Sequence, residues 1–261
     1  MKKVLAIAQN TFREAVRNRI FASLIFFTLA LLGVTLAMSS ASLNEEVRLM
    51  KDIGLFLTST AAVFIAIFTG VNLVYKELER KTIYTIMSKP ISRTQFLTGK
   101  YIGLLQTMFV LVAIMGIVLC GVLVFVGGRV DMAMLQAIWL LFVEVAIVVA
   151  VALVFSSFST PFLSGLMTLG VFVVGRFVDT LRNVRLGDGT EATGADSAAS
   201  EIIKWVTHIV PDLSIFNVTP QVVYNRPMTI DFMAHATLLG FTYIILCLMI
   251  SVFLFSRRDF V

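Results

Sequence analysis

Residues 134–156 read MLQAIWLLFVEVAIVVAVALVFS, and Glu144 is the only charged residue in this run. A helix needs roughly 20 apolar residues to cross a bilayer, so the run predicts a membrane-spanning helix. Lipid cannot hydrogen-bond to the backbone, so a spanning segment must be a helix or part of a closed barrel. The run does not alternate between apolar and polar residues, which excludes a barrel strand. We therefore expect an all-α polytopic membrane protein.

The composition of the whole chain agrees with this interpretation. Hydrophobic residues make up 58% of it and charged residues 14%, whereas soluble domains carry about 25% charged residues. Both cysteines, Cys120 and Cys247, fall within apolar runs, so we expect small core residues and no metal site. Six spans are predicted, at 20–38, 53–75, 102–126, 134–156, 162–178 and 234–255.

The lysines and arginines set the expected orientation, because cytoplasmic loops carry an excess of them. With the N-terminus inside, most of the 21 basic residues fall on the cytoplasmic side. Both termini are therefore predicted to be cytoplasmic, with 76–100 as the largest cytoplasmic loop and 179–233 as an extracytoplasmic segment. The net charge of +5 suits a basic cytoplasmic face, and nothing else indicates nucleic-acid binding.

Amphipathic segments are predicted on both sides of the membrane. Residues 1–19 precede the transmembrane domain of 20–261 and have an apolar stripe opposite a basic face. This pattern predicts an interfacial helix flat on the inner leaflet, although a solvated extension of the first span would also show it. On the outer side, apolar residues at helical spacing lead up to Pro211, which predicts a short helix at the outer leaflet. The N-terminal stripe consists of Leu5, Ala8, Phe12, Ala15 and Val16.

The loop 76–100 concentrates charge in a pattern that still predicts helix. Pro90 ends the first helix, because the residue before a proline is pushed out of helical geometry. Ser92 and Gln95 then form a capping box, which predicts a new helix leading into the third span. This arrangement is either a stiff docking element or a solvated loop that only sets topology. The packing face of the first helix would be Leu78, Thr82, Ile83, Ile86 and Met87.

Several polar residues lie within the predicted spans. A carboxylate at the centre of a span costs roughly 3 kcal/mol on insertion scales, so Glu144 must face protein or water. It would be either a proton or cation site or a hydrogen-bonded group that ties spans together. Arg176 and Asp179, three residues apart, are expected to pair. A stripe on the second span would line a substrate path or serve close helix packing. It consists of Thr58, Ala62, Ala66, Thr69 and Asn72.

A set of motifs resembles one family. The motifs are Glu77-x-Glu79-x-x-Thr82, MSKPISR at 87–93, Gly99-Lys100 and VPDLSIFN at 210–217. With the six predicted spans, they make the chain similar to type-2 ABC exporter permeases. That group is related to drug, polysaccharide and sodium exporters and to the copper-site maturation permease of nitrous oxide reductase. Many relatives have glycine where this chain has Lys81.

The resemblance implies a permease subunit that moves a substrate outward across the plasma membrane of a bacterium or archaeon. The loop would be the coupling helix that docks on a separate ATPase, with two copies of each subunit. Other implied partners are membrane lipids and a periplasmic accessory protein. The implied ATPase-coupling residues are Glu77, Glu79, Arg80, Thr82, Ile83, Met87 and Arg93. The implied substrate path includes Thr58, Thr69, Asn72 and Glu144.

The chain is not expected to be an enzyme. It lacks the phosphate-binding motif G-x-x-x-x-G-K-[ST], so ATP and Mg²⁺ would bind to the partner and no cofactor to this chain. One alternative is a proton-coupled secondary transporter that uses Glu144, and another is a membrane partner of an ATPase that transports nothing. Glu45-Glu46 gives weak grounds for an intramembrane protease, because these acids lie in a short outer loop. The sequence leaves the substrate open among lipids, hydrophobic drugs and peptides.

Overall fold

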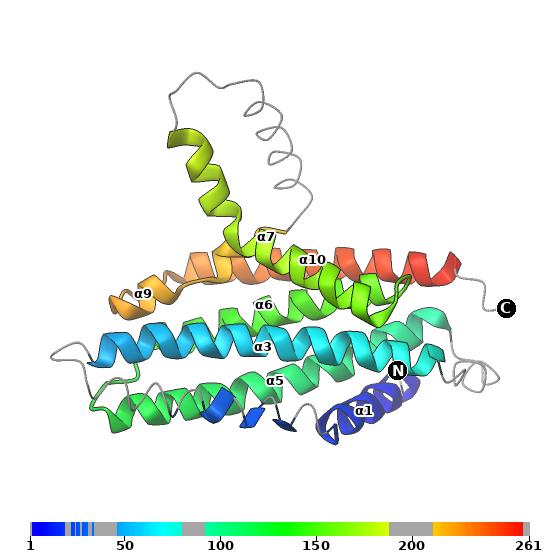
Figure 1. Cartoon of the computed structure of the whole chain (residues 1–261), viewed down its shortest axis with the longest axis horizontal. Coiled ribbons are helices and arrows are strands. Elements are labelled where there is room, and N and C mark those ends of the chain that lie inside the picture. Colours follow the sequence, from blue (N-terminus) through cyan, green and yellow to red (C-terminus); the bar gives the residue numbers. More distant parts are fainter. Residues whose placement is uncertain are drawn as a thin grey trace.

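The computed structural model describes residues 2–18, 46–79, 92–187 and 211–257, together with short helical pieces between 22 and 33. Regular structure in these residues is helical throughout, which confirms the all-α class. Figure 1 shows the long helices side by side, with the last turns of α7 projecting away from the others. The elements are α1 (Lys2–Val16), α3 (Glu46–Glu79), α5 (Arg93–Phe125), α6 (Met132–Ser156), α7 (Pro161–Gly187), the 3-10 helix η1 (Ser214–Phe216), α9 (Thr219–Val223) and α10 (Ile230–Arg257).

Within the described residues, five helices are long and apolar enough to cross a membrane. They coincide with the second to sixth predicted spans, and they identify the chain as an integral membrane protein. The first predicted span, 20–38, falls largely outside the described residues, so that span stays a prediction. The candidate spans are Val47–Asn72, Arg93–Phe125, Met132–Ser156, Pro161–Asp179 and Ile230–Ser256.

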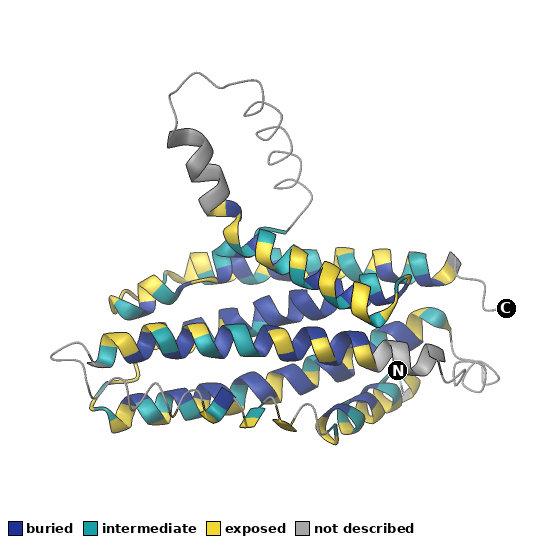
Figure 2. Ribbon diagram, in the orientation of Figure 1, coloured by how far each residue is buried: buried dark blue, intermediate teal, exposed yellow. Residues whose placement is uncertain are grey.

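Helix α6 forms the centre of the bundle. Every residue from Val143 to Leu153 is buried, and Figure 2 shows much of this helix in dark blue. It packs against α3, α5, α7 and α10. A helix that is apolar on all sides can face protein or lipid, and here the neighbouring helices enclose its C-terminal half. Glu144 is therefore surrounded by protein rather than lipid.

Helix α1 packs closely along the first turns of α5. A Cβ built at Gly99 would lie 2.9 Å from the Ile7 side chain, and one at Gly103 only 2.5 Å from the Ala8 carbonyl. Only glycine permits so close an approach of the two backbones. Gly99 lies against Ile7, and Gly103, one turn later on α5, lies against Ala8 and Thr11. This stretch of α1 therefore runs alongside α5. The position of α1 on the inner leaflet stays a prediction.

The apolar stripe predicted on α1 divides between two environments. Ala8 and Ala15 are buried against the protein, whereas Leu5 is 66% exposed and Val16 44% exposed. Thr11 is buried in their place, because the narrow contact with Gly103 selects small side chains on the facing side of α1. Sequence periodicity predicts the helix, but the glycines of a distant segment determine which face is buried.

Within the segment 179–233, the described stretch from Pro211 onward folds back onto the bundle. η1 contacts α6 and α7, and α9 contacts α3 and α6. The apolar residues that anchor this stretch are all buried, namely Leu213, Phe216, Val218 and Val222. The helix predicted to end at Pro211 lies outside the described residues, and the buried stretch after it was not predicted. The sequence feature that indicates this buried stretch is a cluster of apolar residues within the segment predicted to be extracytoplasmic.

Candidate functional site

One end of the bundle gathers the ends of several helices. The N-terminal part of α1, the last turns of α3, the start of α5 and the end of α10 lie together at the right of Figure 1. Helix α3 continues past Asn72, where its candidate span ends, to Glu79. Helix α5 begins at Arg93 and is itself a candidate span. Both ends of the predicted loop 76–100 are therefore helical, in the last turn of α3 and the first turns of α5, and both helices enter the bundle.

The capping box predicted at the start of α5 is confirmed. The Ser92 hydroxyl accepts a hydrogen bond from the backbone N–H of Gln95 at 3.2 Å. The backbone N–H of Ser92 donates to the side-chain oxygen of Gln95 at 3.4 Å. These bonds satisfy N–H groups that a helix start would otherwise leave without partners. The chain therefore leaves the loop in a fixed direction.

The predicted coupling residues are only partly described. Glu77 and Glu79 lie in the last turn of α3, and Arg93 is the first residue of α5. The guanidinium of Arg93 donates to the backbone carbonyls of Phe255, at 3.0 Å, and Ser256, at 2.9 Å. The remaining coupling residues, which lie outside the described part of the chain, are Arg80, Thr82, Ile83 and Met87.

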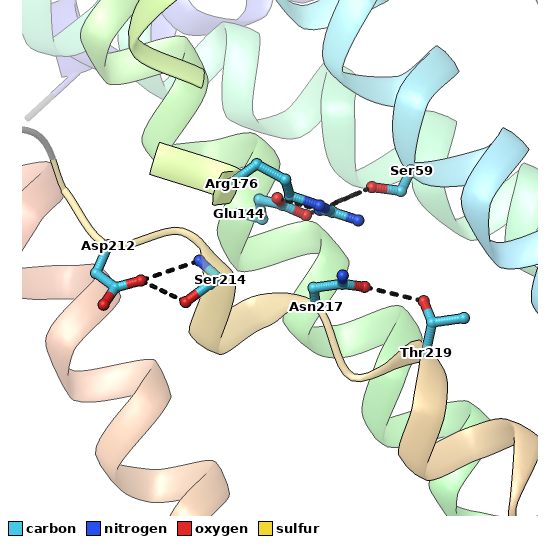
Figure 3. A network of polar contacts seen from close by, with 7 residues as sticks. All are labelled: Ser59, Glu144, Arg176, Asp212, Ser214, Asn217 and Thr219. Carbon is cyan, nitrogen blue, oxygen red and sulfur yellow. Dashed lines mark hydrogen bonds and ion pairs between the residues drawn. The ribbon is translucent and has the colours of Figure 1, made fainter. Parts of the chain in front are cut away.

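A buried ion pair joins three helices in the interior. Glu144, on α6, is 1% exposed, and its carboxylate pairs with the guanidinium of Arg176 on α7. The Ser59 hydroxyl, on α3, accepts from Arg176 at 3.3 Å and donates to Glu144 at 3.5 Å. Figure 3 shows the three side chains pointing toward one another. Pairing of this kind lets an ionisable group persist within a membrane domain.

The predicted pairing of Arg176 with Asp179 is wrong. Asp179 is exposed, whereas Arg176 points into the bundle toward the buried carboxylate of Glu144. Charges attract more strongly in a buried site than in water, so the buried partner is favoured. Helical spacing cannot reveal this pair, because it joins two different helices. The contact supports the interpretation of Glu144 as a group that ties spans together.

The stretch that follows α7 lies against this ion pair. The carboxylate of Asp212 accepts two bonds from Ser214, from its N–H at 3.1 Å and its hydroxyl at 2.5 Å, at the start of η1 (Figure 3). The Thr219 hydroxyl donates to Asn217 at 3.0 Å. A cavity of about 20 Å³ remains beside the ion pair, room for about one water molecule. It is lined by residues that include Ser59, Glu144, Arg176, Asn217 and Thr219.

The stripe predicted on α3 divides between two environments. Thr58 and Thr69 are buried inside the bundle with Ala62 and Ala66, which supports the close-packing interpretation. Asn72 is exposed, and its amide donates to the carbonyl of Phe68 at 2.8 Å. The structure therefore separates Asn72 from the rest of the stripe.

Asn72 lies at the edge of an apolar groove between α3 and α7. The groove has a volume of about 340 Å³, within the range of roughly 300–1,000 Å³ that is usual for small-molecule sites. Phe64 and Phe68 line it from α3, and Phe162 and Leu166 line it from α7. Asn72 is its main polar group. Such a groove suits an apolar molecule with one hydrogen-bonding group.

A second buried polar contact, which was not predicted, lies at the opposite end of the bundle. Lys51, on α3, is 2% exposed, and its ammonium donates to Asp131 at 2.8 Å and to Asn225 at 2.5 Å. Asn225 adopts a left-handed φ of 53°, which asparagine tolerates better than most residues. The contact links α3 to the α5–α6 turn and to the connection between α9 and α10.

The geometry defines a class: a polytopic helical membrane protein with a polar loop carried between two spans. A family comparison matches residues 5–260 to the ABC-2 family transporter proteins, and the chain belongs to this family. The resemblance to type-2 ABC exporter permeases is thereby confirmed, and the chain is the membrane permease component of an ABC transporter. Membership in this family implies association with an ABC ATPase. No curated protein matches the chain in a sequence search.

Proposed function

We propose that this permease exports its substrate with energy from ATP hydrolysed by a separate ATPase subunit. The observation that carries the proposal is the placement of the polar loop between α3 and α5. Both helices are long and continuous, and both pack against the central α6. A force on the loop would therefore act on two spans at once. A stiff element of this kind suits conversion of ATPase closure into movement of the bundle.

The assembly would be a pair of these chains with a pair of ATPase subunits. A cyclic pair is the commonest arrangement among symmetric oligomers, and one chain alone would form half of a pathway. ATP and Mg²⁺ would bind to the ATPase. The loop would face the cytoplasm together with both chain termini, in the plasma membrane of a bacterium or archaeon. The segment 179–233 would face the outside, where an accessory protein could dock.

The groove between α3 and α7 is our candidate for part of the substrate path. Its aromatic walls and the amide of Asn72 favour an apolar or amphiphilic substrate over a sugar or an inorganic ion. Thr58, Thr69 and Glu144 would act indirectly, by holding α3 and α6 in register. The ion pair with Arg176 makes Glu144 a poor proton carrier, which favours an ATP-driven mechanism over a proton-coupled one.

Co-purification tests the proposal. The tagged chain would be expressed with its neighbouring genes, solubilised gently and purified, and the proteins bound to it identified. We expect an ATPase with a phosphate-binding loop in the wild-type complex. We expect Glu79→Lys and Arg80→Glu to lose it, because reversed charges oppose docking. Arg129→Glu, in the turn at the other end of the bundle, is the control and should retain it. Equal retention by all variants would contradict the assignment of the loop.

A further inference from the structure

We infer that Arg93 is a positioning residue that joins the loop to the last span, rather than a contact with the ATPase. The inference rests on the proposed function, because it concerns how loop movement reaches the bundle. Arg93 stands at the first position of α5, directly after the capping residue Ser92. Its guanidinium reaches across to the other end of the chain, where α10 stops.

The contact satisfies a specific need of α10. The last four carbonyls of a helix have no partner within it, and α10 ends at Arg257. Arg93 donates to two of these carbonyls, those of Phe255 and Ser256. A positive charge at this position also complements the partial negative charge of a helix C-terminus. Arg93 therefore serves as the C-terminal cap of a helix that lies far away in sequence.

Aromatic packing reinforces this contact between the start of α5 and the end of α10. The rings of Phe96 and Phe255 stack with centroids 6.1 Å apart and planes at 21°. The ammonium of Lys100 lies 5.9 Å from the centre of the Phe96 ring, within the range of a cation–π contact. Arg93, Phe96 and Lys100 are spaced at i, i+3 and i+7, so they share one face of α5. That face connects α5 to the end of α10.

Through the contact between the start of α5 and the end of α10, the loop can move α10 as well as α3 and α5. Helices α3 and α5 are attached to the loop by the chain itself, whereas α10 is attached only through side chains. A displacement of the first turn of α5 would draw the end of α10 with it, because the ring stack of Phe96 and Phe255 is buried. Arg93 thus transmits movement and need not touch the ATPase.

The experiment compares Arg93→Ala and Arg93→Lys with the wild type, and uses Thr94→Ala, an exposed neighbour in the same turn, as the matched control. Hydrogen exchange over residues 250–257 is measured first, on the purified chain alone. We expect roughly tenfold faster exchange in Arg93→Ala, as loss of a charge-assisted cap would give. Thr94→Ala should match the wild type, and Arg93→Lys should fall between, because an ammonium can still cap one carbonyl.

The second measurement uses the purified complex with its ATPase. We expect Arg93→Ala to retain the ATPase in full, with the KM for ATP unchanged and kcat shifted toward that of the free ATPase subunit. Arg93→Lys should restore kcat in part, which a purely structural defect would not predict. Loss of ATPase binding in Arg93→Ala alone would overturn the inference, since it would make Arg93 a docking contact. Unchanged exchange in 250–257 would overturn it as well.

The two proposals fail in distinguishable ways. If the wild-type chain binds no ATPase, the proposed function fails and the role of Arg93 in transmission falls with it. If the wild type binds the ATPase and Arg93→Ala keeps normal kcat, only the inference about Arg93 fails.

Discussion

The carboxylate of Glu144 on α6 is paired with the guanidinium of Arg176 on α7, inside the bundle and beside the Ser59 hydroxyl of α3. The pair fixes the relative position of three helices at one level. Breaking a buried pair from one side costs more than removing both charges, because one charge is then left buried without a partner.

The first prediction is that removing one charge of this pair costs more stability than removing both. Arg176→Met should lower the free energy of unfolding by about 3–5 kcal/mol, because it leaves Glu144 buried and unpaired. The double variant Glu144→Gln/Arg176→Gln should lose less than Arg176→Met, since neither side chain then carries a charge. Arg129→Met, at an exposed turn, is the control. Denaturant titration in mixed micelles measures all three, and a double variant as unstable as Arg176→Met would show that the pair carries no coupling.

The second prediction concerns the contact between α1 and α5. Gly103→Ala should lower stability by about 1–3 kcal/mol, because the added methyl would meet the backbone carbonyl of Ala8 at 2.5 Å. Gly121→Ala is the matched control on the same helix, since nothing lies within 4 Å of a Cβ there. It should be neutral or stabilising by up to about 1 kcal/mol, as alanine favours helix. Thermal unfolding in detergent distinguishes them, and equal effects would argue against the close packing of α1.

The third prediction concerns the lysine at the other end of the bundle. Lys51→Met should cost about 1–3 kcal/mol, because Asp131 and Asn225 lose their shared donor. Hydrogen exchange over residues 222–229 should rise, since this connection loses its contact with α3. Asp52→Asn, at the exposed neighbouring position, should change neither quantity. Exchange in 222–229 that stays at the wild-type rate would mean that the packing of Val222 alone holds the connection.

Much of the architecture follows from sequence alone, because span length and backbone hydrogen bonding leave few choices. The spans from the second to the sixth match helices α3, α5, α6, α7 and α10. The capping box at Ser92 is also found where local chemistry puts it. These features depend on a few neighbouring residues, so a single sequence carries enough information to predict them.

The contacts between helices could not be predicted in the same way. Arg176 has an acidic residue three positions away, and only the packing of α7 on α6 reveals that Glu144 is its partner. Arg93 was assigned to ATPase coupling from its place in a motif, whereas its contacts are with the end of α10. Such pairs join segments that are remote in sequence, and no periodicity within either segment encodes them.

The central claim is that the loop between α3 and α5 contacts the ATPase, and site-specific photocrosslinking tests it most directly. A photoreactive amino acid would replace Ile83 in the loop, or Arg129 at the opposite end of the bundle, in cells that express the neighbouring genes. We predict a crosslink between position 83 and an ATPase with a phosphate-binding loop, and none from position 129. A crosslink from position 129, or none from position 83 while the ATPase still co-purifies, would contradict the account.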